Sequence, residues 1–388
     1  MNCIYCEKLI TTPSSEHIIQ SALGSKLKSS KLLCADCNNY FSRKDSGYMD
    51  SCLVDQFNLF RNLFSIWGDR RTPPPVLRNV GEIEGKTIHL GPGGTPIFAK
   101  SIREESVDEN GQLVISVSSP DIEKAKEQYG HIKKQFKEDG VKLGSSKKYR
   151  LYCDELLRFN FSFGGELALK GVLKNIYNFL FYLIRDKEIE IPISIQDLDT
   201  VRKYLRNNES SDEVYASIDY KNPIPVDLNE NELSNYIFIF GSEYFKVIFG
   251  YFIVFGHVNF SAVLKEGYSG KNFGYGIKHS PIDKSKTIIE DIEIPTFDAS
   301  ITKNYPLHAN DYFPVAQEKF SQLLKLYFEE SSRSIFEDIV NISLSERWPK
   351  EGEQILPEHN KKVSRSISEK FAKFYFKIPS EEDVDLDE

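Results

Sequence analysis

Four cysteines near the amino terminus form two Cys-x2-Cys pairs, Cys3/Cys6 and Cys34/Cys37. Each such turn can direct two thiolates at one ion, and two turns supply the tetrahedral sulfur shell that zinc prefers. Six cysteines in 388 residues do not form the framework of a disulfide-rich protein, so metal binding is favoured. The spacing predicts a structural zinc site, and reduced cysteines without a ligand are the alternative.

A second group of chemically capable residues lies within the same stretch. Glu16-His17 stands between the cysteine pairs, and Asn38 directly follows the last cysteine. A carboxylate, an imidazole and an amide can together hold and use a catalytic metal ion. Each also has a simpler interpretation: a surface carboxylate, a structural histidine, and an asparagine that caps a helix.

The whole stretch resembles the zinc-bearing members of the HNH, or ββα-metal, endonuclease family, over residues 1–50. Those members show Cys-x2-Cys, an acidic residue followed by His-Ile, a glycine turn, and Cys-x2-Cys-Asn at the start of a helix. The corresponding residues here are Cys3/Cys6, Glu16-His17-Ile18, Ala22-Leu23-Gly24, Cys34/Cys37-Asn38, then Asn39-Tyr40-Phe41 and Asp45.

The resemblance implies a role for each of these residues. His17 is expected to be the general base, for which a pKa near neutrality is suited. Glu16 and Asn38 are expected to ligate a catalytic divalent ion, Mg²⁺ or Mn²⁺, through hard oxygen atoms. Asp45 is expected on the same helix face as Asn38, as a further ligand or as a residue that positions His17. The sequence departs from the family's third-histidine pattern, because no histidine occurs between 18 and 88.

Positive charge near this group suggests contacts to phosphate, which position a nucleic acid without reading its sequence. Solvated surface lysines give the same pattern. The net charge of −8 argues against broad affinity for nucleic acid but permits a locally basic face. The candidate phosphate contacts are Lys26, Lys28, Lys31, Arg43 and Lys44.

The rest of the chain indicates an α+β fold, with a small zinc-bound ββα-metal domain followed by a larger α+β module. We expect one helix from Cys37 to Leu53, a long apolar helix from Gly165 to Arg185, three or four strands between Tyr236 and Leu264, and a helix at 315–329. The predicted divisions are a nuclease domain at 1–54, a linker helix and β-rich region at 55–150, a module of unknown ligand at 151–380, and an acidic disordered tail at 381–388.

These observations predict a metal-dependent endonuclease that hydrolyses phosphodiester bonds, with double-stranded DNA as the preferred substrate. By resemblance, we expect the carboxy-terminal module to regulate or target the nuclease in bacterial antiphage defence, with a regulatory protein or small-molecule activator and a homodimer as partners. No membrane is expected and the location is cytoplasmic, because no run approaches the roughly twenty apolar residues of a membrane span. The alternatives are a non-catalytic zinc ribbon that binds nucleic acid or protein, and an RNase.

Overall fold

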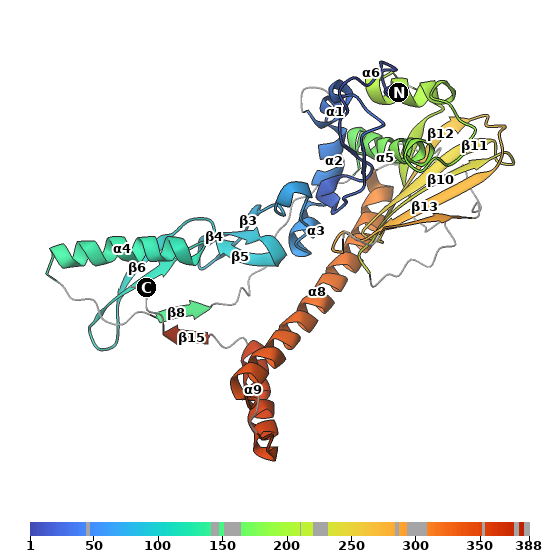
Figure 1. The fold of residues 1–388 in the computed structure, drawn as a ribbon. Helices are drawn as coiled ribbons and strands as arrows, with labels where there is room; N and C mark the ends of the chain where they lie inside the picture. Colours follow the sequence, from blue (N-terminus) through green and yellow to red (C-terminus); the bar gives the residue numbers. More distant parts are fainter. Residues whose placement is uncertain are drawn as a thin grey trace. The chain divides into compact units, whose positions relative to one another are not determined.

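The computed structural model describes residues 1–43, 47–140, 147–150, 164–209, 211–219, 232–283, 287–292, 309–350, 354–375 and 380–383. Helices and sheets are both present, which confirms the α+β class (Figure 1). The chain divides into two compact units: unit 1 contains Met1–Pro75 and Asn160–Lys325, and unit 2 contains Val76–Phe159 and Leu326–Glu388. Each unit combines two separate stretches of chain, whereas the sequence-based divisions are contiguous; those boundaries stay a prediction.

Unit 1 begins with a small ββα arrangement. Strand β1 (Glu16–His17) pairs antiparallel with β2 (Lys28–Ser29), and a short 3-10 helix, η1 (Ser21–Leu23), lies between them. Gly24 ends η1 at φ +91°, where its missing Cβ would lie 2.5 Å from Pro281. Both the left-handed backbone and this close approach require glycine.

The helical region after Cys37 differs from the prediction of one helix through Leu53. The structure contains α1 (Ala35–Ser42) and α2 (Met49–Asp55) instead. Arg43 is extended at φ −89° and ψ 140°, and the Gly47 amide donates to the Tyr40 carbonyl at 2.8 Å, so the chain turns back onto α1. The prediction of a single helix face carrying Asn38 and Asp45 is therefore wrong, because α1 ends before Asp45; that residue lies outside the described residues.

Helix α5 (Glu166–Arg185) forms the centre of unit 1 and confirms the predicted long helix. It is long and apolar enough to cross a membrane, but 89% of the apolar window is buried inside the protein, as in a core helix. Gly171 allows α2 to approach α5 closely, since a Cβ there would lie 2.8 Å from the Met49 carbonyl oxygen. This contact brings the start of α2 next to α5.

A six-stranded antiparallel sheet packs against α5, and its strand order is β14-β13-β10-β11-β12-β9 (Figure 1). Of the three or four strands predicted between Tyr236 and Leu264, the structure has three, β10, β11 and β12, and Gly250 on β11 lies directly against Ile176 of α5. The strands are β9 (Tyr215–Asp219), β10 (Asn235–Ser242), β11 (Val247–Val254), β12 (Val258–Glu266), β13 (Phe273–His279) and β14 (Thr287–Asp291). The remaining short helices of this unit are α3 (Asn58–Leu63), η2 (Asp69–Arg71), η4 (Gln196–Leu198) and α6 (Asp199–Asn207).

Unit 2 contains small sheets and helices. Its elements are β3 (Leu77–Ile83), β4 (Lys86–Gly91), η3 (Pro92–Gly94), β5 (Thr95–Phe98), β6 (Ile102–Val107), β7 (Leu113–Ser118), α4 (Ile122–Glu138), β8 (Lys147–Arg150), α9 (Pro357–Tyr375) and β15 (Ser380–Asp383). Helix α8 (Ala309–Arg347) is much longer than the predicted helix at 315–329 and continues from unit 1 into unit 2.

The described residues include part of the acidic tail, and the disorder expected for residues 381–388 stays a prediction. Ser380–Asp383 forms β15, which pairs antiparallel with β8, so that Glu382 lies opposite Lys148. Residues 384–388 lie outside the described residues.

Candidate active site

The four cysteines of the two pairs come together as the sequence predicts. Their Sγ atoms all lie within 4.8 Å of one another, and those of Cys6 and Cys34 are 3.6 Å apart. A tetrahedral zinc ion with bonds of ~2.3 Å places its sulfur ligands about 3.8 Å apart. The hydrogen bond from Cys37 lowers the pKa of Cys3 to about 4, which favours the thiolate form that binds zinc. The donor set therefore fits a structural zinc ion.

Local backbone structure explains how the cysteines meet. The Glu7 amide donates to the Cys3 carbonyl and closes the first Cys-x2-Cys turn, while Cys34 stands at the amino-terminal cap of α1. The first turn is attached to the core by the Ile4 amide, which donates to the Leu32 carbonyl at 3.0 Å. A zinc ion bound by these sulfur atoms would therefore join the first Cys-x2-Cys turn to the start of α1.

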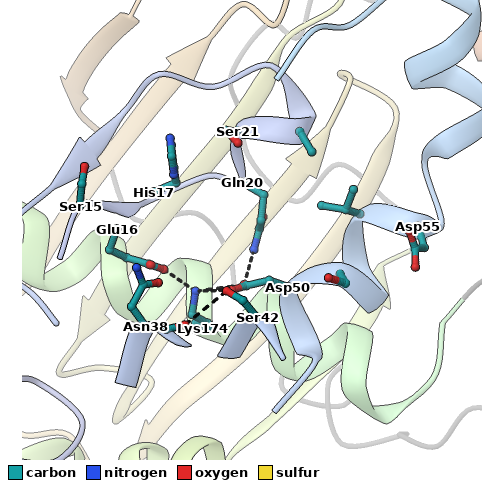
Figure 2. Close-up of a pocket in the computed structure, with 13 residues that line it drawn as sticks. Ser15, Glu16, His17, Gln20, Ser21, Asn38, Ser42, Asp50, Asp55 and Lys174 are labelled. Carbon is teal, nitrogen blue, oxygen red and sulfur yellow. Dashed lines mark hydrogen bonds and ion pairs between the residues drawn. The ribbon is translucent and has the colours of Figure 1, made fainter. Parts of the chain in front are cut away.

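A cavity of about 330 Å³ lies within unit 1, and Glu16, His17 and Asn38 all line it (Figure 2). Successive residues of a strand project to opposite sides, and Glu16 and His17 leave β1 in opposite directions (Figure 2). Glu16 points toward α5, and Asn38 approaches it from the first turn of α1. The cavity thus gathers three of the four residues that the sequence predicts for catalysis.

Glu16 is buried, with 4% of its surface exposed. Its Oε1 accepts hydrogen bonds from the Lys174 ammonium and, at 3.1 Å, from Asn178 Nδ2. Burial raises the pKa of Glu16, and the positive charge of Lys174 opposes that rise. The ammonium favours the carboxylate form of Glu16, which is the form that can serve as an anionic ligand.

Asp50, which the sequence analysis did not identify, is the second carboxylate of the site. It lies in the first turn of α2, and both of its oxygens are 3.0 Å from the Lys174 Nζ. Its Oδ1 also accepts a hydrogen bond from Gln20 Nε2 at 2.9 Å. The sequence offers Asp45, Asp50 and Asp55 after Asn38, and the choice among them depends on where α1 ends.

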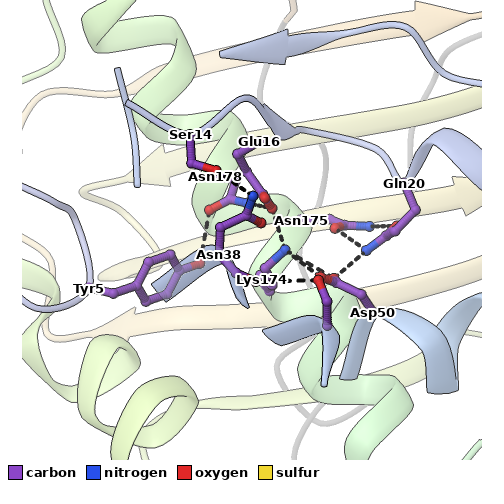
Figure 3. A network of polar contacts seen from close by, with 10 residues as sticks. Tyr5, Ser14, Glu16, Gln20, Asn38, Asp50, Lys174, Asn175 and Asn178 are labelled. Carbon is purple, nitrogen blue, oxygen red and sulfur yellow. Dashed lines mark hydrogen bonds and ion pairs between the residues drawn. The ribbon is translucent and has the colours of Figure 1, made fainter. Parts of the chain in front are cut away.

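Asn38 is half-buried, and its Nδ2 donates to Ser14 Oγ at 2.6 Å. This bond uses the nitrogen of the amide, so the carbonyl oxygen is the atom left to serve as a ligand. Asn38 lies beside Glu16 in both close-up views (Figures 2 and 3). Two carboxylates and an amide oxygen are the hard donors that Mg²⁺ and Mn²⁺ accept.

His17 is half-buried on the other side of β1. Its Nε2 lies 3.4 Å from Asp69 Oδ2, and Lys28 Nζ lies 3.5 Å from the same oxygen. The contact to Asp69 lacks hydrogen-bond geometry, and within the described residues Nε2 has no hydrogen-bond partner. Burial lowers the pKa of His17, while the Asp69 carboxylate partly opposes this effect. A neutral imidazole whose ring nitrogen has no hydrogen-bond partner in the described part of the chain is the form that can accept a proton.

The predicted phosphate contacts have different surroundings. Lys26 and Arg43 are exposed, and exposed Lys28 forms the ion pair with Asp69. Lys31 instead has a structural contact, because its Nζ donates to the Arg185 carbonyl at the end of α5. Lys44 lies outside the described residues.

The ββα unit carries a cluster of four cysteines that fits zinc, and it places an imidazole and oxygen donors in one cavity. This arrangement is that of a zinc-binding domain of the ββα-metal class. Residues 3–51 match the model of the HNH endonuclease family, so the resemblance is confirmed for this segment. The family points to nuclease activity on nucleic acid. A search of the curated proteins found no match, and a search of the solved structures found none either.

Proposed function

We propose that this protein is a metal-dependent endonuclease that cleaves double-stranded DNA. One observation carries the proposal: Glu16 and Asp50 direct three carboxylate oxygens at a single cation, the Lys174 ammonium, in the cavity that His17 and Asn38 also line. A group of oxygens that already holds a cation is suited to a divalent ion. Glu16, Asn38 and Asp50 are the residues that would hold it.

The chain's own side chains supply the remaining chemistry. A bound Mg²⁺ or Mn²⁺ would neutralise the charge that develops on the phosphate. His17 accepts the proton of the attacking water, and the phosphodiester bond breaks to leave a 5′-phosphate and a 3′-hydroxyl. Burial lowers the pKa of His17 and so favours the neutral form that this role requires. Lys26, Lys28 and Arg43 contact the phosphate backbone, while zinc on the four cysteines holds the segment folded.

We propose that other parts of the chain regulate the nuclease or target it to its substrate. The HNH segment shares unit 1 with α5 and the six-stranded sheet, and unit 2 adds further surface. We propose that these parts receive a protein or small-molecule signal in antiphage defence, and that two chains act together to cut both strands.

The test combines metal analysis with cleavage assays on plasmid DNA and on RNA, in Mg²⁺ and in Mn²⁺. His17→Ala is expected to lower the cleavage rate by roughly 10²–10⁴-fold, the usual contribution of a general base. His131→Ala is the matched control, because that histidine is 71% exposed on α4. A zinc-loaded His17→Ala protein that cleaves as fast as the parent would defeat the assignment, and cleavage of RNA alone would replace DNA as the substrate.

A further inference from the structure

Lys174 is the least expected residue of the site, because it belongs to α5 and lies outside the segment that matches the HNH family. Its side chain is 1% exposed. The ammonium contacts Glu16 Oε1 and both oxygens of Asp50, the latter at 3.0 Å (Figure 3). An ammonium has three donors, so carboxylates of the site satisfy its hydrogen-bonding capacity.

Neutral amides hold the same carboxylates from other directions (Figure 3). Asn178 donates to Glu16, and its own oxygen accepts a hydrogen bond from Tyr5 at 2.9 Å. Gln20 donates to Asp50 and forms a reciprocal amide pair with Asn175, with both hydrogen bonds at 2.8 Å. Both carboxylates therefore keep a fixed partner if the ammonium leaves.

We propose that Lys174 is a built-in counter-cation that occupies the metal position in the ion-free protein and is displaced when a divalent ion binds. This inference rests on the proposed function of the site. Lys174 is thus a positioning residue: it neutralises Glu16 and Asp50 before the ion arrives, and it sets the ion concentration at which the site fills.

Displacement follows from the charges and from the available space. A divalent ion and the ammonium would compete for the same oxygens of Glu16 and Asp50, and the two cations would repel each other at such short range. Lys174 itself lines the cavity of about 330 Å³, so its flexible stem has space into which it can withdraw. The amide contacts of Asn178 and Gln20 stay in place during the exchange.

Lys170 offers a matched comparison one turn earlier on α5. It is also buried, at 3% exposure, but it pairs with Glu166, whose side chain is 63% exposed, and with Asn208. These partners do not line the cavity. Substitution of Lys170 therefore tests the cost of losing a buried lysine from α5 without touching the site.

The first experiment measures Mn²⁺ affinity of the full-length, zinc-loaded protein by calorimetry, for the parent, Lys174→Met and Lys170→Met. Methionine keeps the length of the stem and removes the charge. We expect Lys174→Met to bind Mn²⁺ at least about tenfold more tightly than the parent, which corresponds to about 1.4 kcal/mol, and Lys170→Met to bind as the parent does. Equal or weaker binding by Lys174→Met overturns the inference.

The second experiment uses the unaltered protein and so does not depend on a variant that folds. Amine acylation followed by mass spectrometry reports the accessibility of each lysine with and without saturating Mn²⁺. We expect Mn²⁺ to increase modification of Lys174 several-fold and to leave Lys170 unchanged. Unchanged modification of Lys174 under saturation also overturns the inference.

These results separate the inference from the proposed function on which it rests. If the parent binds Mn²⁺ and cleaves DNA but Lys174→Met gains no affinity, the counter-cation role fails and the nuclease assignment stands. If neither the parent nor Lys174→Met binds Mn²⁺ at this site, both fail together.

Discussion

Asp50 gives the sharpest test of the site, because the structure and the sequence pattern favour different aspartates. In the structure Asp50 shares a cation with Glu16, whereas the sequence pattern favours Asp45. We expect Asp50→Asn to weaken Mn²⁺ binding strongly and to lower cleavage at limiting Mn²⁺. The substitution keeps the size of the side chain and the oxygen that accepts from Gln20.

The expected magnitude follows from the charge that the substitution removes. Opposite unit charges about 4 Å apart attract by about 4 kcal/mol at an effective dielectric constant near 20, and a doubly charged ion gains about twice as much. Desolvation of the ion and the remaining amide dipole offset more than half of this. A net loss of about 3 kcal/mol corresponds to roughly 100-fold weaker Mn²⁺ binding.

Calorimetric titration with Mn²⁺ and cleavage rates over a Mn²⁺ series measure the effect. Asp55→Asn is the matched control, because Asp55 also lines the cavity but accepts a hydrogen bond from Asn58 rather than from Lys174. The reasoning is refuted if Asp50→Asn binds Mn²⁺ like the parent while Asp45→Asn loses binding. That result would make Asp45, which the sequence pattern favours, the metal ligand in place of Asp50.

Three further perturbations test the surroundings of the site. Gly171→Ala places a Cβ 2.8 Å from the Met49 carbonyl. We expect a loss of about 1–3 kcal/mol in unfolding free energy, together with weaker Mn²⁺ binding. Unchanged Mn²⁺ affinity would contradict the proposed link between α5 and α2. Cys37→Ser leaves three thiolates, and we expect loss of bound zinc and a lower Tm, measured by metal analysis and calorimetry; full zinc retention would argue against the four-sulfur site. Burial lowers the pKa of His17, so kcat/KM should rise with pH through a value below 6.5 and then level off. Asp69→Asn removes a charge that favours the protonated ring, so the acid limb should move to lower pH; a shift to higher pH would exclude this role.

The zinc cluster and the Glu16-His17 pair were predictable because their signals are local. Cysteine spacing specifies which sulfurs can share an ion, and strand alternation separates Glu16 from His17. The place of Asn38 in the site was predictable because the residue directly follows the last cysteine, at the start of α1. In all three cases, the geometry depends on a few neighbouring residues.

Asp50 was not predictable because its position depends on a tertiary contact. The helix after Cys37 ends at Ser42, and Gly47 then packs onto Tyr40 so closely that a Cβ would lie 2.9 Å from the Tyr40 carbonyl. This turn starts a new helix and brings Asp50 to the cavity. Helical propensity alone favours a continuous helix, which would place Asp45 there instead.

Lys174 left a weak signal that could have been used. The helix from Gly165 to Arg185 was predicted from its apolar face, yet Lys174 and Asn178 stand four residues apart within it, the spacing that places two side chains on one helix face. A buried lysine needs an anionic partner. The pattern therefore indicated that α5 meets carboxylates, but only the fold identifies them as Glu16 and Asp50.

The HNH segment and α5 form one structural body through contacts at several points. Tyr177 donates to the Ile4 carbonyl within the first cysteine turn, and Arg185 donates to the Asn2 and Lys31 carbonyls. Because Lys174 lies one turn before Tyr177 on the same helix, these contacts help to set its position relative to the carboxylates. The opposite side of that helix packs on the six-stranded sheet, where Ile176 meets Gly250. We therefore expect a ligand that shifts the sheet to move Lys174 as well, so the regulation proposed above would act through metal binding.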